Sequence, residues 1–120
     1  MNNDALHMAL LIDFFGDLLT DKQREYLDLY CNEDLSLAEI AERAGISRQG
    51  VHDIITRARK SLEEIERKTG VVHRWLEEKE KLACAHGLSE TLARLCADDE
   101  SAALARELTA TLKSLMESHA

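Results

Sequence analysis

The chain has 120 residues, a formal net charge of −8 and no proline, where an average chain of this length would contain about six prolines. Long stretches consist of Ala, Leu, Glu, Lys and Arg, which favours an all-α protein of one domain, or one domain with a helical appendage. The net acidity argues against broad, non-specific binding to nucleic acid.

The first predicted helix runs from Asn3 to Phe15, with apolar residues on more than one face, and we expect Gly16 to end it. Thr20 can cap the start of a second helix, with Gln23 as its reciprocal partner in a capping box. This second helix should end near Asn32. Both helices should be partly buried against others.

A short third helix is predicted from Leu37 to Ala44. Ser36 and Glu39 can form its capping box, and Gly45 allows the left-handed backbone that a tight turn after a helix needs. Ser47 is then placed to cap a longer helix. A short helix, a glycine turn and a longer helix form the helix-turn-helix unit, which places a helix in a nucleic-acid groove.

The fourth predicted helix runs from Arg48 to about Lys68. Its apolar residues recur at three- and four-residue steps, so they form one stripe that should pack on the earlier helices. The opposite face is polar and is available to a partner. We predict that the following residues contact nucleic acid: Ser47, Arg48, Gln49, His52, Asp53, Thr56, Arg57 and Lys60, with Arg59 beside them.

The residue types on this face suit nucleic acid. Arg and Gln can make bidentate contacts with base edges, and Arg, Lys, Ser and Thr can contact phosphates. The segment from Arg43 to Lys60 contains five basic residues and one acidic residue. That residue, Asp53, would repel a phosphate. It can instead accept from a cytosine amino group, hold Arg57 four residues later, or indicate that the partner is a protein.

Gly70 should break the fourth helix, and a further helix is predicted from Val71 to His86. We expect Gly87 and Ser89 to begin a new short helix, followed by a break at residues 98–100. The predicted domains are a helix-turn-helix core, residues 1–70, and a C-terminal helical extension, residues 71–120.

The last predicted helix carries a narrow apolar stripe. Its residues are Leu104, Leu108, Leu112 and Leu115. An exposed row of leucines is an interaction surface, so either the same chain or a second chain should cover it. We expect pairing between two chains, as a homodimer, because two-fold assemblies are the commonest oligomers.

Catalytic chemistry has little support in this chain. No nucleophile–base arrangement and no phosphate-binding loop occur, so we expect no enzyme activity and no cofactor. Cys84 and His86 lack the two further ligands that zinc needs, so we expect no metal site. The three cysteines form no CxxC pair, and neither a signal-peptide pattern nor a membrane-length segment occurs. A cytoplasmic protein with reduced thiols is expected.

Three stretches carry a resemblance to known proteins: FFGDLLTDKQ, YLDLYCNEDLSLAEIAE and SRQGVHDIITR. They resemble the promoter-reading helix-turn-helix of bacterial sigma factors, region four. They are more similar still to the YlxM family, small bacterial helix-turn-helix proteins usually encoded beside the GTPase of the signal recognition particle. The resemblance covers roughly Leu10 to Leu76.

The resemblance to YlxM implies a cytoplasmic accessory or regulatory protein of the signal recognition particle pathway, with the particle's RNA and GTPase as partners. The helix-turn-helix alone implies a DNA-binding transcriptional regulator. A third interpretation, favoured by Asp53 and the net charge of −8, is a protein-interaction module that has lost nucleic-acid binding. DNA offers a helix its major groove, whereas RNA usually has to offer a widened or irregular one.

Overall fold

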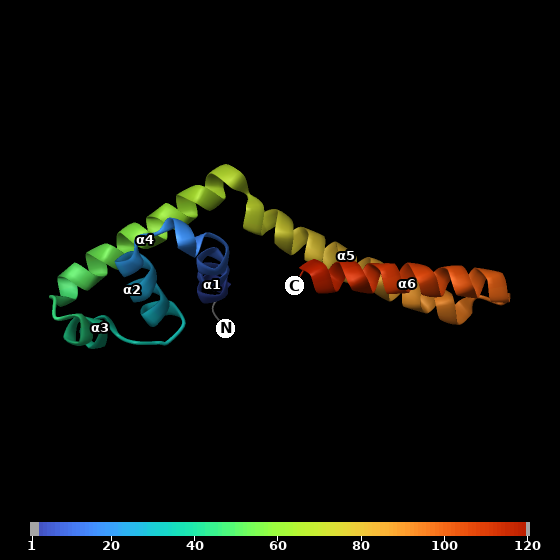
Figure 1. Ribbon diagram of the computed structural model, residues 1–120, viewed down its shortest axis with the longest axis horizontal. Coiled ribbons are helices and arrows are strands. Elements are labelled where there is room, and N and C mark those ends of the chain that lie inside the picture. The colour runs from blue at the N-terminus through green and yellow to red at the C-terminus, as the bar shows by residue number, and fades with distance from the viewer. Residues whose placement is uncertain (1–2, 120) are drawn as a thin grey trace. The chain divides into compact units, whose positions relative to one another are not determined.

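The computed structural model describes residues 3–119, which form six α-helices, one short 3₁₀ helix and no β-strand (Figure 1). The fold is therefore all-α, as predicted. The chain divides into two compact units, Met1–Val72 and His73–Ala120. Within the described part of the chain, no helix has the length and apolarity needed to span a membrane.

The first unit begins with helix α1, Asn3–Phe15, the short 3₁₀ helix η1, Gly16–Leu18, and helix α2, Asp21–Cys31. The predicted capping box at the start of α2 is confirmed. The Gln23 backbone N–H donates to Thr20 Oγ1 at 3.2 Å, and the Thr20 backbone N–H donates to Gln23 Oε1 at 3.1 Å. These two bonds satisfy donors that the first turn of a helix otherwise leaves unpaired.

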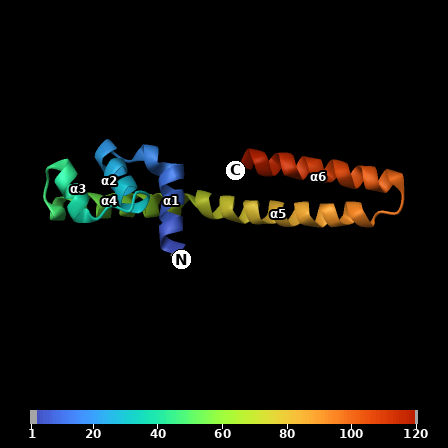
Figure 2. The ribbon, with the colours of Figure 1, turned by 90° about the horizontal axis from the view of Figure 1, so that it is seen from below.

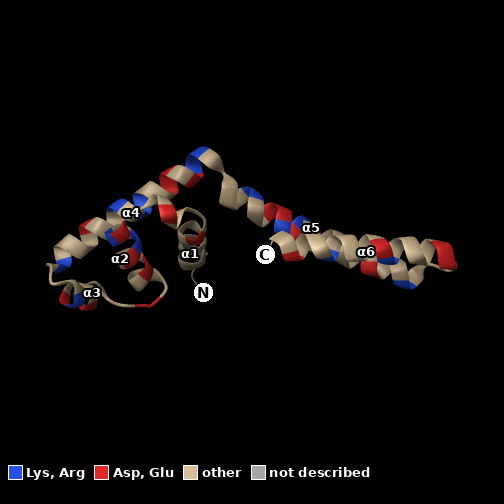
Figure 3. Ribbon diagram, in the orientation of Figure 1, with Lys and Arg blue, Asp and Glu red and all other residues tan. Residues whose placement is uncertain are grey.

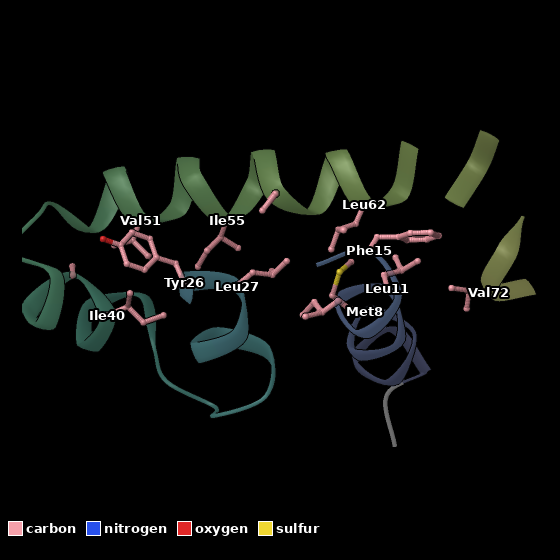
Figure 4. Close-up of a cluster of buried hydrophobic side chains, with 13 residues drawn as sticks. Met8, Leu11, Phe15, Tyr26, Leu27, Ile40, Val51, Ile55, Leu62 and Val72 are labelled. Carbon is pink, nitrogen blue, oxygen red and sulfur yellow. The ribbon is translucent and has the colours of Figure 1, made fainter. Parts of the chain in front are cut away.

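Helices α3, Leu37–Ala44, and α4, Arg48–Thr69, complete the packing of this unit. Helix α4 contacts α1, α2 and α3, and Figure 4 shows its apolar side chains pointing toward all three. The core joins residues from every helix of the unit: Leu11 from α1, Leu27 from α2, Ile40 from α3, and Val51, Ile55, Ala58 and Leu62 from α4. The predicted apolar stripe of α4 is thus the buried one.

Gly70 ends α4, as predicted from the sequence, and it adopts the left-handed conformation, at φ 63°. Helix α5, Val71–Leu95, starts at once. Its second residue, Val72, is fully buried in the core of the first unit, and its backbone N–H donates to Glu66 Oε1 at 3.0 Å. The first two residues of α5 therefore belong to the first unit.

The sequence prediction was wrong about Gly87 and Ser89. They do not begin a new helix, because α5 runs through both without interruption. A single glycine within a helix costs only about 1 kcal/mol, and the Ala and Leu residues on both sides are strong helix formers. Ser89 is not a cap: its hydroxyl Oγ donates to the carbonyl oxygen of Ala105 at 3.2 Å.

Helix α6, Asp99–His119, follows a break at the predicted place, where Asp98 Oδ1 accepts from the Ser101 backbone N–H at 2.7 Å. It runs back along α5 as an antiparallel hairpin (Figure 2). At the open end of the hairpin, the Trp75 indole N–H donates to the His119 carbonyl oxygen at 2.8 Å, and the two rings stack. Trp75 thus anchors the end of α6 on α5.

The leucine stripe of α6 is not the face that packs on α5. Ala105 is buried and Thr109 bonds to Ser89, so the contact face contains small and polar residues. Leu112 is half-buried and lies on this contact face, three residues after Thr109. The other three leucines of the predicted stripe remain largely exposed: Leu104, Leu108 and Leu115. The helix folds back within its own chain, yet these leucines stay uncovered in the single chain.

Candidate nucleic-acid interface

The turn between α3 and α4 has the geometry of a helix-turn-helix. Ser36 Oγ accepts from the Glu39 backbone N–H at 3.1 Å, and Glu39 Oε1 accepts from the Ser36 backbone N–H at 3.0 Å. These bonds lower the pKa of the Glu39 carboxyl, because the backbone N–H of Ser36 stabilises its charged form. The predicted capping box of α3 is confirmed.

Gly45 adopts the predicted left-handed conformation, at φ 69° and ψ 30°, and its N–H donates to the Ala41 carbonyl oxygen at 2.9 Å. Two residues later, Ser47 caps α4 by accepting from the Gly50 backbone N–H at 3.0 Å. The direction in which α4 leaves the turn therefore depends on one positive-φ residue and one cap.

Replacing Gly45 with alanine should destabilise the protein by about 1 kcal/mol, because a residue with a Cβ atom is strained in the left-handed region. Gly87→Ala is the matched control. It should stabilise by about 0.5–1 kcal/mol, because Gly87 lies inside a helix. A Cβ at either position meets no atom within 4 Å, so backbone conformation alone separates the two variants. Urea unfolding measures both, and equal effects would contradict the assignment.

The structure places most of the predicted contact residues on one solvent-facing side of α4 and its cap. Thr56 is half-buried, and the other seven are exposed: Ser47, Arg48, Gln49, His52, Asp53, Arg57 and Lys60. Their exposure follows from the burial of the apolar stripe on the opposite side. The eight residues are called the α4 polar face below, and their contact with nucleic acid stays a prediction.

Arg59 lies beside the α4 polar face, as expected, but its side chain is not fully exposed. Its side chain is half-buried and lines a surface cavity together with Tyr30 and Cys31. Burial raises the pKa of the Cys31 thiol, and the nearby Arg59 guanidinium acts in the opposite direction. Arg59 follows the buried Ala58 directly and lies at the boundary of the two faces, where periodicity alone does not decide its side.

Asp53 holds Gln49 rather than Arg57. Gln49 Nε2 donates to Asp53 Oδ1 at 2.9 Å, and His52 Nδ1 lies 3.5 Å from the same oxygen. This bond uses one of the two N–H donors of the Gln49 amide. The second donor and the carbonyl oxygen suffice for a bidentate contact with adenine, so Asp53 orients Gln49 without blocking it.

The α4 polar face is longer than a groove is wide. Lys60 lies twelve positions after Arg48, which corresponds to about 18 Å along the axis, against a major groove about 12 Å wide. If this face binds nucleic acid, Gln49 and His52, near the start of α4, are expected to meet base edges. Arg48, Arg57 and Lys60, toward the two ends of the face, are expected to meet phosphates at the groove margins.

Figure 3 shows basic residues along α4 in an otherwise mixed or acidic unit. Arg43 adds one more cation: it is exposed in the last turn of α3. The predicted contact set leaves it out, although the first helix of such a unit crosses the nucleic-acid backbone. The run of basic residues that begins at Arg43 was the feature of the sequence from which Arg43 could have been added to the predicted contact residues.

Comparison with known proteins identifies the family. The model of UPF0122, described as "Putative helix-turn-helix protein, YlxM / p13 like", matches residues 2–94 of this chain. The chain belongs to the UPF0122 family. The match extends beyond the resemblance seen in the sequence and ends one residue before the end of α5. It covers the whole of the α3–α4 unit described above.

Individual members of the UPF0122 family are also similar to this chain. A UPF0122 protein of Acetivibrio thermocellus is 56% identical over 73 residues, which are 61% of this chain and 62% of the relative. One from Thermoanaerobacter sp. (strain X514) is 54% identical over 82 residues, 68% of this chain and 70% of the relative. One from Symbiobacterium thermophilum is 44% identical over 91 residues, 76% of this chain and 82% of the relative. The match thus spans about three fifths of the Acetivibrio relative's length.

Proposed function

We propose that this protein is a non-enzymatic, cytoplasmic accessory protein of the signal recognition particle pathway that binds nucleic acid through the α4 polar face. Its ligand in this proposal is the RNA of the particle, and the particle's GTPase is a further partner. The observation that carries nucleic-acid binding is the α3–Gly45–α4 turn, which leaves the basic start of α4 exposed. The pathway comes from the resemblance to YlxM.

The alternative ligand is DNA, and it is favoured by the straight, regular form of α4, which runs from Arg48 to Thr69 without a break. Such a helix fits the major groove of B-DNA directly. An RNA ligand has to offer a bulge or an irregular stem that opens its groove. In the RNA case, the binding site should therefore be a non-helical part of the particle RNA.

A pull-down from bacterial lysate with the full chain, followed by sequencing of RNA and DNA and identification of proteins, tests the proposal. Recovery of particle RNA supports it. Enrichment of promoter DNA instead supports a transcriptional role, and proteins without nucleic acid would contradict both. Fluorescence anisotropy with purified particle RNA, and with a duplex of the same length, then compares the two ligands at equal salt.

A further inference from the structure

The hairpin of α5 and α6 has almost no core of its own. Among residues 73–119, only Ser89 and Ala105 are buried. Apolar burial is the main favourable term in folding, and two helices of this kind rarely bury enough surface alone. The hairpin therefore needs an additional surface on which to pack.

Exposed leucines supply such a surface, and they come from both helices. We call them the leucine face: Leu88, Leu92 and Leu95 of α5, with Leu104, Leu108 and Leu115 of α6. Each is between 48% and 76% exposed. A monomeric protein rarely leaves a contiguous apolar patch of this kind uncovered.

The six leucines lie on the same side of the hairpin. On α5, Leu88 directly precedes the contact residue Ser89, and on α6, Leu104 and Leu108 directly precede the contact residues Ala105 and Thr109. Because successive residues of a helix are rotated by about 100°, each of these leucines points about 100° away from the side of its helix that meets the other helix. In two antiparallel helices, residues that directly precede the contact residues point to the same side of the pair, so the leucines of α5 and α6 share one face.

Charges around the leucine face are arranged for self-pairing. Lys81 lies about 10 Å from Leu88 along α5, toward the open end of the hairpin, where it and Leu115 line the same surface cavity. The acidic start of α6, Asp99 and Glu100, lies at the opposite end of the hairpin from its open end, and Figure 3 shows acidic residues there. A two-fold axis near Leu88, running across both helices, therefore brings Lys81 of one copy over the end of α5 of the other, beside Glu100 at the start of α6.

The size of the leucine face also suits a second copy. Two helices side by side, each about 10 Å wide, present a surface about 20 Å across. Over the 21 residues of α6, this surface is about 30 Å long, which gives roughly 600 Å² per copy. Both copies together bury about 1,200 Å², at the lower end of the range for stable, specific interfaces.

We propose that two copies of this chain associate through their leucine faces, in antiparallel orientation, to form a four-helix bundle. Each copy covers the leucines of the other, and Lys81 pairs with the acidic start of α6 across the interface. The proposal does not depend on the nature of the nucleic acid. The first unit, which contains the helix-turn-helix, takes no part in this association.

Sedimentation equilibrium of the full chain tests the association. The chain of 13.5 kDa should sediment at about twice this mass at micromolar concentrations, and its thermal midpoint should rise with concentration. Leu92→Glu combined with Leu108→Glu should restore the single-chain mass. Leu76→Glu is the matched control, because Leu76 is also an exposed leucine of α5 but points away from the leucine face, and it should leave the dimer intact.

Circular dichroism of each variant separates dissociation from unfolding. If the double variant has a lower helix content than the wild-type chain, its mass is not informative, and the mass of the wild-type chain tests the proposal instead. A wild-type chain that is monomeric at several hundred micromolar overturns the proposal. Lys81→Glu should weaken the dimer about tenfold at low salt, and adding Glu100→Lys to the same chain should restore most of the loss. Failure of this restoration would overturn the antiparallel orientation.

Discussion

Replacement of both Arg48 and Arg57 by alanine should weaken nucleic-acid binding by roughly 60-fold at 0.1 M salt. Each arginine is exposed on the α4 polar face, so each can contact one phosphate. Loss of two phosphate contacts lowers the slope of log K against log salt concentration by about 1.8 for duplex DNA and about 1.4 for a single strand. Anisotropy titrations at several salt concentrations measure both quantities.

The matched control for the arginine pair is Arg106→Ala combined with Lys113→Ala. These two residues are also exposed, and their loss changes the net charge by the same amount, but they belong to α6. The control should keep the slope of the wild-type protein. If the two double variants behave alike, binding depends on net charge alone and the α4 polar face is not the contact surface.

Leu27→Ala should lower the free energy of unfolding by about 3 kcal/mol, within the range found when buried leucines are truncated. Leu27 is fully buried between α2 and α4 (Figure 4). Its loss removes apolar contacts and leaves a cavity, because the neighbouring helices move only partly into the space. Urea unfolding followed by circular dichroism gives the difference.

Leu18→Ala provides the same chemical change at an exposed position, since Leu18 is 69% exposed in η1. It should change stability by less than about 0.5 kcal/mol. A large effect of both variants would mean that η1 packs more tightly than its exposure indicates. A small effect of both would contradict the core assigned to the first unit.

Most of the first unit could be predicted from the sequence because its helix ends depend on local chemistry. A capping box such as that of Thr20 and Gln23 needs two residues three positions apart, and both can be read from the sequence. The same holds for Gly45 and Gly70, because the left-handed conformation strongly favours glycine. The buried stripe of α4 follows from periodicity in the same way.

The C-terminal unit was predicted less well because its contacts depend on a partner helix. Gly87 was expected to start a new helix, but the surrounding residues outweigh the cost of one glycine. The face of α6 that meets α5 includes Ala105 and Thr109, whose small side chains allow close approach. A search for apolar periodicity finds the larger leucines instead, and three of them, Leu104, Leu108 and Leu115, lie beside the contact face and stay exposed.

Within the α4 polar face, exposure was predictable, but the pairing within it was not. Several partners were open to Asp53, and the choice of Gln49 depends on side-chain conformations that spacing does not determine. Arg59 shows the same limit at the edge of the face. Its side chain turns toward α2, where Tyr30 and Cys31 offer a surface.

The contact between Ser89 and α6 restricts how the hairpin can slide. Ser89 Oγ lies 3.2 Å from the Ala105 carbonyl oxygen and 2.5 Å from Thr109 Oγ1, and it is almost completely shielded from water. A shift of α6 by one turn would still offer Ser89 a backbone carbonyl oxygen, but it would place Ala105 or Lys113 where Thr109 lies and remove the bond between the two hydroxyl groups, at a cost of about 0.5–1.5 kcal/mol. One register of α5 and α6 is therefore favoured over the registers one turn away. The contact of a single serine thus determines where the leucines of α5 lie relative to those of α6.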